Sequence, residues 1–344
     1  MPQADTVKWA TGSMHVTVII VTYNRCQSLA KTLESVALSS LPTSVEWEVL
    51  LVDNNSSDQT LQVAEDFRAR YPGRFRYLRQ PNPGKSFGLN AGILASRGDI
   101  LAFIDDDVTV ESTWLQNLTA ALQHGEWVGA GGRILLERNF SPPRWLALEG
   151  PWNMGGMLAG FDLGDKPGEL HEAPYGTNMA FHKKMFEKYG LFRTDLGPSP
   201  NREVPRPNED TEFGRRLMAA GERLHYEPRA VVHHPVPPER LRKGYFLAWW
   251  FDYGRARTRE KGKGAPVWGI PRHFFSIPKM IATHLSTRVW RWLWTLDPQQ
   301  RFFRKGVAWM SAGQIVETYR LARGDKKQRT GAPQETKIGL NART

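Results

Sequence analysis

The chain has 344 residues, one cysteine (Cys26) and a formal net charge of +11. The single cysteine excludes a disulfide framework and a thiolate metal site, and it is typical of a reducing compartment. Residues 1–11 lack the apolar core of a signal peptide, and no stretch reaches the roughly 20 apolar residues of a membrane-spanning helix, so we expect a cytoplasmic protein.

Apolar strands and amphipathic helices alternate along the first part of the chain. The predicted strands are Val16–Val21, Val49–Val52, Arg74–Arg79 and Ile100–Ile104. The spacing of apolar residues predicts helices over Leu29–Ala37, Leu61–Phe67, Ser86–Ala95 and Ser112–Leu122. Such alternation indicates parallel strands joined by helical crossovers, and therefore an α/β fold.

Polar segments follow three of these strands, after Val21, Val52 and Ile104. The carboxyl ends of parallel strands share one edge of the sheet, and ligands of α/β proteins bind at that edge. We therefore expect the three polar segments to converge on one site.

The segment after Ile104 is the run Asp105-Asp106-Asp107. Adjacent carboxylates repel one another unless a cation lies between them, so the run indicates a site for a hard divalent ion, Mg²⁺ or Mn²⁺. Such an ion usually completes its coordination with substrate phosphates. The alternative is a solvated acidic turn, because aspartate is common in turns.

The following part of the chain is less regular. Residues 139–175 are rich in glycine, proline and aromatic residues without a clear period, which favours loops around a donor or acceptor pocket. Phe181–Tyr189 has helical spacing, Glu209 and Asp210 precede another predicted helix, and Ala230–Val232 is a last predicted strand that runs into His233 and His234.

Five short motifs, taken in order, resemble those of the family 2 glycosyltransferases. They are Val21–Asn24, Val52–Asp58, Gly98-Asp99 leading to Asp105–Asp107, Asn208–Asp210, and His233-His234. The resemblance covers about residues 15–240 and implies a GT-A fold, a Rossmann-like, mostly parallel sheet flanked by helices. It divides the chain into a tail (1–14), a catalytic domain (15–240), a helical region (241–325) and a disordered tail (326–344).

The resemblance implies that one group of residues binds the nucleotide of a sugar donor. Tyr23 corresponds to an aromatic ring that stacks on the base, Asp53 and Asn54 to residues that bind the base and ribose, and Lys85 to a cation near the diphosphate. The expected nucleotide-binding residues are Val21, Tyr23, Asn24, Asp53, Asn54, Lys85, Asp105 and Asp106. A structural role remains the alternative: a strand-end aromatic for Tyr23, a helix cap for Asp53, a solvated charge for Lys85.

The metal ligands and the catalytic base are also implied by the resemblance. Asp105 and Asp107 match a DXD motif for Mg²⁺ or Mn²⁺, completed by His234, with His233 as the alternative. Asp210 corresponds to the catalytic base and Glu209 is its less favoured neighbour. Both acidic residues can instead stabilise the first turn of a helix, and both histidines can instead be surface residues.

The chemistry of sugar transfer requires these groups. A metal offsets charge on the leaving phosphate, and one carboxylate deprotonates the acceptor hydroxyl, so a single displacement inverts the anomeric carbon. We expect a UDP-sugar donor and a glycan or lipid-linked acceptor in cell-surface polysaccharide or glycoconjugate synthesis. No Gln-x-x-Arg-Trp motif of processive synthases occurs, which favours non-processive transfer. The alternatives are a nucleotidyltransferase and a non-enzymatic nucleic-acid-binding protein.

The C-terminal third differs sharply in charge from the rest. Residues 240–344 hold 22 Lys+Arg and 6 Asp+Glu, a net charge of +16, against −5 for residues 1–239. They also hold seven of the 13 tryptophans. Basic, tryptophan-rich helices are typical of segments on an anionic membrane surface, and Leu285, Val289, Leu293 and Leu296 are predicted to share one helix face. We expect peripheral contact with the cytoplasmic face of the membrane and no nucleic acid; packing against the catalytic domain is the alternative.

Overall fold

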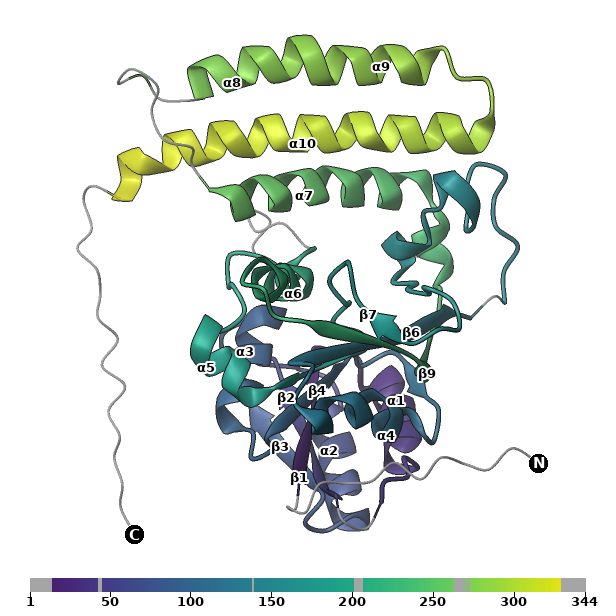
Figure 1. The fold of residues 1–344 in the computed structure, drawn as a ribbon, viewed down its shortest axis with the longest axis vertical. Helices are drawn as coiled ribbons and strands as arrows, with labels where there is room; N and C mark the ends of the chain where they lie inside the picture. The colour runs from purple at the N-terminus through teal and green to yellow at the C-terminus, as the bar shows by residue number, and fades with distance from the viewer. Residues whose placement is uncertain are drawn as a thin grey trace.

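The computed structural model describes residues 14–42, 45–137, 139–200, 207–262, 270 and 273–328 (Figure 1). The strands are β1 (Met14–Thr22), β2 (Val45–Asp53), β3 (Phe75–Arg79), β4 (Ile100–Ile104), β5 (Thr109–Val110), β6 (Gly129–Leu136), β7 (Gly168–Glu169), β8 (Met179–His182) and β9 (Leu224–His234). The α-helices are α1 (Cys26–Ala37), α2 (Thr60–Arg70), α3 (Lys85–Ala95), α4 (Trp114–Ala120), α5 (Lys183–Tyr189), α6 (Glu209–Ala219), α7 (Lys243–Lys261), α8 (His273–Lys279), α9 (Ser286–Leu293) and α10 (Pro298–Gln328). Short helices are η1 (Ala121–His124), η2 (Gly150–Trp152), η3 (Gly155–Leu158), η4 (Pro238–Leu241) and the π-helical η5 (Met280–Leu285).

The strands form one sheet in the order β3-β2-β1-β4-β8-β6-β9-β5, with β7 paired to β9. The strands from β3 to β4 are parallel, as predicted. Thr22 is paired with Asp53, and Ile20 with Ile104, so the polar segments after β1, β2 and β4 do meet at one edge. The mostly parallel α/β fold and the helical C-terminal region are confirmed.

Both faces of the sheet are covered by helices (Figure 1). Successive side chains of a strand point to opposite faces, and β4 shows the consequence: Ile100 and Ala102 pack in the core under α1, α2 and α4, whereas Leu101 and Phe103 pack under α3, α5 and α6. This two-sided burial explains why the central strands are continuous apolar runs.

The second half of the sheet corrects one prediction. Phe181 lies in β8 and not in a helix, since it pairs with Leu101 of β4, and the helix begins only at Lys183. Strand β6 was not predicted because its sequence begins Gly-Ala-Gly-Gly. Those glycines are required by packing: a Cβ at Gly129 would lie 2.3 Å from the Phe181 ring, and one at Gly132 would lie 2.4 Å from the Ala230 carbonyl oxygen.

The C-terminal helices are stacked beyond one end of the sheet, with α7 nearest to it, α10 next and the α8–α9 segment outermost (Figure 1). A buried ion pair joins α7 to α10, with 3.0 Å between Arg255 Nε and Glu317 Oε2. Leu296 lies beyond the end of α9 and is 92% exposed, so it does not share a helix face with Leu285 as predicted. Among the described residues, no helix combines the length and apolar character that a bilayer crossing needs.

The predicted terminal tails lie largely outside the described residues. Met14 already belongs to β1, and α10 extends to Gln328, so the first three residues of the expected disordered tail are helical. The predicted boundary near residue 240 falls within η4 and stays a prediction.

Close backbone packing fixes α7 against α10. A Cβ at Gly254 would lie 2.0 Å from the Met310 carbonyl oxygen, whereas one at Gly244, in the same helix, would meet nothing within 4 Å. We expect Gly254→Ala to lower the free energy of unfolding by about 1–3 kcal/mol through overpacking. Gly244→Ala should raise it slightly, by about 0.5–1 kcal/mol, through helix propensity. Thermal or urea unfolding measures both, and equal stability of the two variants would contradict the packing.

Candidate active site

A cleft of about 1110 Å³ opens at the carboxyl edge of the parallel strands. One wall comes from the segments after β1 and β4, and the opposite walls come from α6, α7 and the loop around η3. Among the predicted site residues, those that line the cleft are Val21, Tyr23, Asn54, Lys85, Asp105, Asp106, Asp107, Glu209, Asp210 and His234. The structure thus places most of the residues predicted from the sequence around a single cavity.

Three carboxylates at the end of β4 are neutralised by cations from different elements. Asp105 Oδ1 lies 2.6 Å from Lys85 Nζ, and its Oδ2 accepts a hydrogen bond of 2.6 Å from the Thr177 hydroxyl. Burial alone would raise the pKa of Asp105, but the Lys85 ammonium and both hydrogen bonds hold it well below its usual range. Asp105 therefore remains ionised in the cleft.

Arg25 neutralises the other two carboxylates. Its Nη1 lies 3.0 Å from Asp106 Oδ1 and 2.8 Å from Asp107 Oδ2. Asp106 also accepts a 2.7 Å hydrogen bond from the Thr22 hydroxyl, and burial raises its pKa to about 6 despite Arg25. Asp106 therefore ties the end of β4 to the end of β1.

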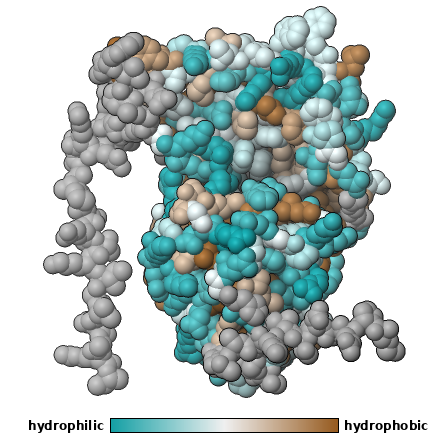
Figure 2. All heavy atoms as spheres, in the orientation of Figure 1, coloured by the Kyte–Doolittle hydropathy of each residue, from teal (hydrophilic) through white to brown (hydrophobic). Residues whose placement is uncertain are grey.

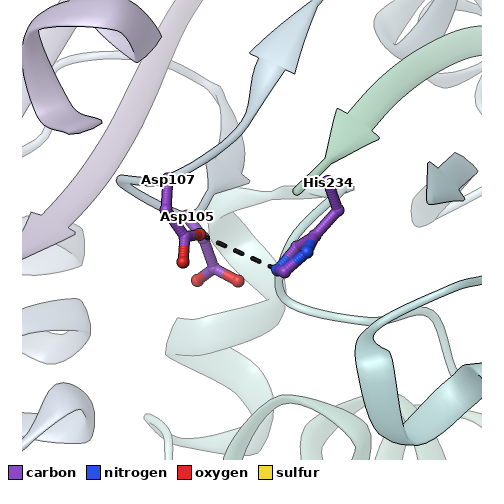
Figure 3. Close-up of side chains that lie close together, drawn as sticks. All are labelled: Asp105, Asp107 and His234. Carbon is purple, nitrogen blue, oxygen red and sulfur yellow. Dashed lines mark ion pairs between the residues drawn. The ribbon is translucent and has the colours of Figure 1, made fainter. Parts of the chain in front are cut away.

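Asp105, Asp107 and His234 bring three potential ligand atoms within 4.8 Å of one another (Figure 3). His234 Nε2 lies 3.8 Å from Asp107 Oδ1, while its Nδ1 lies 2.7 Å from the Pro235 carbonyl oxygen. That carbonyl can only accept a hydrogen bond, so Nδ1 carries the proton and the Nε2 lone pair faces the carboxylates. Burial lowers the pKa of His234, which keeps the ring neutral. Two carboxylates and one neutral imidazole suit a divalent cation.

The two consecutive histidines differ because β9 alternates its side chains. His233, paired with Thr109 of β5, is partly exposed, and its Nε2 lies 3.4 Å from Glu111. His234 is 2% exposed and points to the carboxylates. The strand geometry therefore places His234, and not His233, at the candidate metal site.

The residues predicted to bind the nucleotide differ in how accessible their side chains are from the cleft. Tyr23 is 57% exposed at the cleft, where a planar ligand can reach its ring. Asp53 accepts hydrogen bonds from the Ser56 N–H (2.8 Å) and the Tyr77 hydroxyl (2.7 Å), and Asn24 Oδ1 accepts one of 2.7 Å from the Ser57 N–H. In this structure Asp53 and Asn24 hold turns beside the cleft.

Asn54 is also engaged by the backbone. Its Nδ2 donates to the Asn82 carbonyl (2.7 Å), and its Oδ1 accepts from the Gly84 N–H (2.7 Å). The side chain thereby fixes the turn that precedes Lys85. Gly84 itself has φ 132°, a conformation that favours glycine. Asn54 therefore shapes the cleft by positioning Lys85 as well as by lining it.

Lys85, the first residue of α3, links the carboxylate run to α6. Its Nζ lies 2.6 Å from Asp105 Oδ1 and 3.5 Å from Glu209 Oε1. Burial alone would lower the pKa of Lys85, but the negative charges of Asp105 and Asp210 raise it, so the ammonium stays protonated. A fixed positive charge thus lies between the candidate metal site and the candidate base.

Glu209 and Asp210 differ in environment although they are adjacent. Glu209 is 3% exposed, and burial followed by the charge of Asp210 raises its pKa to about 8, so it is mostly protonated at neutral pH. Asp210 Oδ2 accepts a 2.5 Å hydrogen bond from the Gly176 N–H, and its Oδ1 accepts one of 2.6 Å from the Thr211 N–H. These two backbone donors fix the Asp210 carboxyl group at the cleft, whereas Glu209 is buried, so Asp210 is the better placed of the two to accept a proton.

Several residues at the site were missed by the sequence analysis. Thr177 hydrogen-bonds Asp105, and Arg240 Nη2 lies 3.6 Å from Asp107 Oδ2. Glu260 of α7 accepts a 2.8 Å hydrogen bond from Asn208, whose φ of 85° sets up the start of α6. Only Arg25 could have been predicted from its local sequence, since it directly follows the first motif. The other residues are brought to the site by contacts between segments that are distant in sequence.

The sequence is similar to those of known glycosyltransferases. Residues 17–190 match the family described as "Glycosyl transferase family 2". The chain is 27% identical over 263 residues to the succinoglycan biosynthesis protein ExoM of Rhizobium meliloti, covering 75% of this chain and 80% of that protein. It is 26% identical to a glucosyl-dolichyl phosphate glucuronosyltransferase of Haloferax volcanii, over 70% of this chain and 76% of the relative.

Solved structures show the same fold. A mannosyltransferase from Pyrobaculum calidifontis, in complex with GDP-Man and Mn²⁺, superposes with a TM-score of 0.54 at 17% identity, covering 95% of this chain and 80% of the other. GalNAc-T7 with UDP, GalNAc and Mn²⁺ gives a TM-score of 0.52 at 18% identity, covering 72% and 51%. At these identities the likeness concerns the fold alone.

The metal site predicts different behaviour for the two histidines. We expect His234→Ala and Asp107→Ala to weaken Mn²⁺ binding by about tenfold or more, because each loses a potential ligand. His233→Ala should bind Mn²⁺ like the wild type, since its ring lies elsewhere. Calorimetric titration with MnCl₂ measures the three affinities. Wild-type affinity in His234→Ala would contradict the assignment.

Proposed function

The chain belongs to glycosyl transferase family 2, and on that premise we propose that it is a metal-dependent, inverting enzyme. It transfers a sugar from a nucleoside diphosphate sugar, with UDP-sugars favoured, to a hydroxyl of a glycan or lipid-linked acceptor. One observation carries the proposal: a candidate metal site, a fixed lysine and an available carboxylate line the same cleft. The similarity to a succinoglycan biosynthesis protein and to a glucosyl-dolichyl phosphate glucuronosyltransferase supports a role in polysaccharide or glycoconjugate synthesis.

In this proposal the donor binds at the carboxyl edge of the sheet. Tyr23 packs on the base, and Asp107 and His234 hold the metal with Asp105 beside them. A bound Mg²⁺ or Mn²⁺ supplies positive charge where negative charge develops on the departing diphosphate. Lys85 and Arg240, both within the cleft, add positive charge on the same side. The imidazole ligand favours Mn²⁺ over the harder Mg²⁺.

Asp210 acts as the base in a single displacement. The acceptor hydroxyl oxygen forms a bond to the anomeric carbon, the bond from that carbon to the diphosphate oxygen breaks, and the hydroxyl proton passes to Asp210. Such general-base catalysis is worth roughly 10²–10⁴-fold in rate. Glu209, protonated at neutral pH and beside Lys85, contributes by shaping the site.

Two isosteric substitutions separate the adjacent carboxylates. Asp210→Asn removes the base, so transfer should fall by about 100-fold or more, while donor binding with Mn²⁺, measured by calorimetry, stays within about twofold. Glu209→Gln replaces a protonated acid by a neutral amide and should retain transfer within about fivefold. Full transfer activity in Asp210→Asn would contradict the assignment of the base.

The donor itself is identified by screening a panel of nucleotide sugars for donor hydrolysis.

The outer C-terminal helices support a further part of the proposal, peripheral contact with the cytoplasmic face of a membrane. Trp290, Trp294 and Phe274 are each at least 63% exposed on the α8–α9 segment. Figure 2 shows brown apolar side chains among teal ones along the top edge, where Figure 1 places this segment. Lys279 and Arg291 lie on the same segment, within the part of the chain that carries the net charge of +16. Exposed aromatic and basic side chains together suit an anionic lipid surface.

Vesicle flotation tests this contact. The wild type should float with phosphatidylserine-containing vesicles at low salt, and Trp290→Ala/Trp294→Ala should reduce partitioning by about tenfold. The control Leu38→Ala/Leu61→Ala removes two exposed apolar side chains of the catalytic domain and should float like the wild type. Failure of the wild type to bind the vesicles would remove the membrane contact and leave the transferase proposal intact.

A further inference from the structure

Not all tryptophans of the basic region face outward. Trp249, Tyr253 and Arg257 follow one another at four-residue spacing along α7, and all three line the cleft. The Trp249 and Tyr253 rings are nearly parallel, with an interplanar angle of 13° and centroids 5.1 Å apart. Together they form an aromatic wall, defined here as Trp249 and Tyr253, inside the cavity that holds the candidate base.

Polar groups of α6 line the same cavity. Asp210, Thr211 and Arg215 all border the cleft. The Thr211 hydroxyl and Arg215 Nε are buried and have no hydrogen-bond partner among the residues that the structure describes. A buried polar atom without a partner costs roughly 1–3 kcal/mol, so both atoms would gain from a polar ligand that reaches them from the cleft.

We propose that the space between α6 and the aromatic wall is the acceptor subsite, and that it binds a sugar ring of the acceptor. The inference rests on the proposed transferase function and specifies its second substrate. The C–H faces of a pyranose pack on aromatic rings, and here they match the aromatic wall. The hydroxyl groups at the edge of the pyranose match the polar groups of Thr211 and Arg215. A bare isoprenoid chain would leave those polar atoms unpaired.

The position of the subsite agrees with the chemistry. Thr211 directly follows Asp210, so a sugar that hydrogen-bonds Thr211 presents a hydroxyl beside the base. Glu260 fixes the two walls relative to each other, since it accepts hydrogen bonds from Asn208 (2.8 Å) and Arg215 (2.7 Å) while belonging to α7. The aromatic wall is held in place by the contact of Gly254 with α10.

The test compares transfer with donor hydrolysis. The donor found in the nucleotide-sugar screen is offered with a panel of octyl glycosides and, separately, with phytanyl phosphate, an isoprenoid phosphate without sugar. We expect the wild type to use at least one octyl glycoside with saturable kinetics. Trp249→Ala should raise the acceptor KM by about tenfold, the equivalent of 1.4 kcal/mol, while hydrolysis of the donor without acceptor stays within about twofold.

Two conservative variants distinguish a loss of acceptor binding from a loss of folding. Trp249→Phe retains an aromatic face and should hold the acceptor KM within about threefold of the wild type. Thr211→Val keeps the shape, loses the hydroxyl, and should raise the acceptor KM by about fivefold. The control Tyr319→Ala removes a half-exposed aromatic ring of α10 that does not line the cleft, and should leave both rates unchanged.

The contrary outcomes are distinct. Use of phytanyl phosphate but of no octyl glycoside would overturn the sugar subsite and leave the transferase proposal standing. An unchanged acceptor KM in both Trp249→Ala and Thr211→Val would overturn it as well. A wild type that hydrolyses no nucleotide sugar would instead overturn the proposed function on which the inference rests.

Discussion

The concentration of negative charge at the end of β4 is the constraint on which the site depends. Three consecutive carboxylates follow a strand that is buried on both faces, so their charge must be offset by groups from other elements. Lys85 comes from α3, Arg25 from the start of α1 and Arg240 from η4. The convergence of these cations holds the loop ends around the cleft. It also leaves Asp107 and His234 facing each other across 3.8 Å, a separation suited to binding one divalent ion.

The same charge pattern separates the roles of the two acidic residues of α6. Glu209 lies against Lys85 in a buried position and keeps its proton at neutral pH, whereas Asp210 accepts two backbone hydrogen bonds at the cleft. Adjacent carboxyl groups on one helix can thus differ in role, one as a buried structural group and the other as the candidate base. The family resemblance already favoured Asp210, but the burial of Glu209 and the backbone contacts of Asp210, which explain the division, arise only in the fold.

The first half of the sheet and most of the site could be predicted because their signals are local. The apolar runs of β1, β2 and β4 and the polar residues after them are contiguous in sequence, and parallel pairing alone brings them together. Strand β6 escaped prediction because its glycines are required by the Phe181 ring, a contact distant in sequence. The choice between His233 and His234 depends on which of the two faces of β9 each side chain occupies, and this is set by the alternation of side chains along the strand.

Composition suggested a membrane surface for all tryptophans of the basic region, and the structure divides them. Trp249 and Trp250 both line the cleft, and Trp250 also packs against Phe303 of α10, while Trp290 and Trp294 are exposed on the outermost helices. Counting residues cannot make this distinction, since it depends on which side of each helix contacts the domain. Helix α7 therefore forms part of the candidate active site as well as of the C-terminal region.

We propose that Asp107 and His234 bind a divalent ion that holds the diphosphate of the donor. A crystal structure of the protein with Mn²⁺ and UDP measures this directly through the anomalous signal of manganese. We expect a manganese peak within bonding distance of an Asp107 oxygen, of His234 Nε2 and of the diphosphate oxygens. A diphosphate bound in the cleft without manganese at these two side chains, or manganese bound elsewhere, would contradict it.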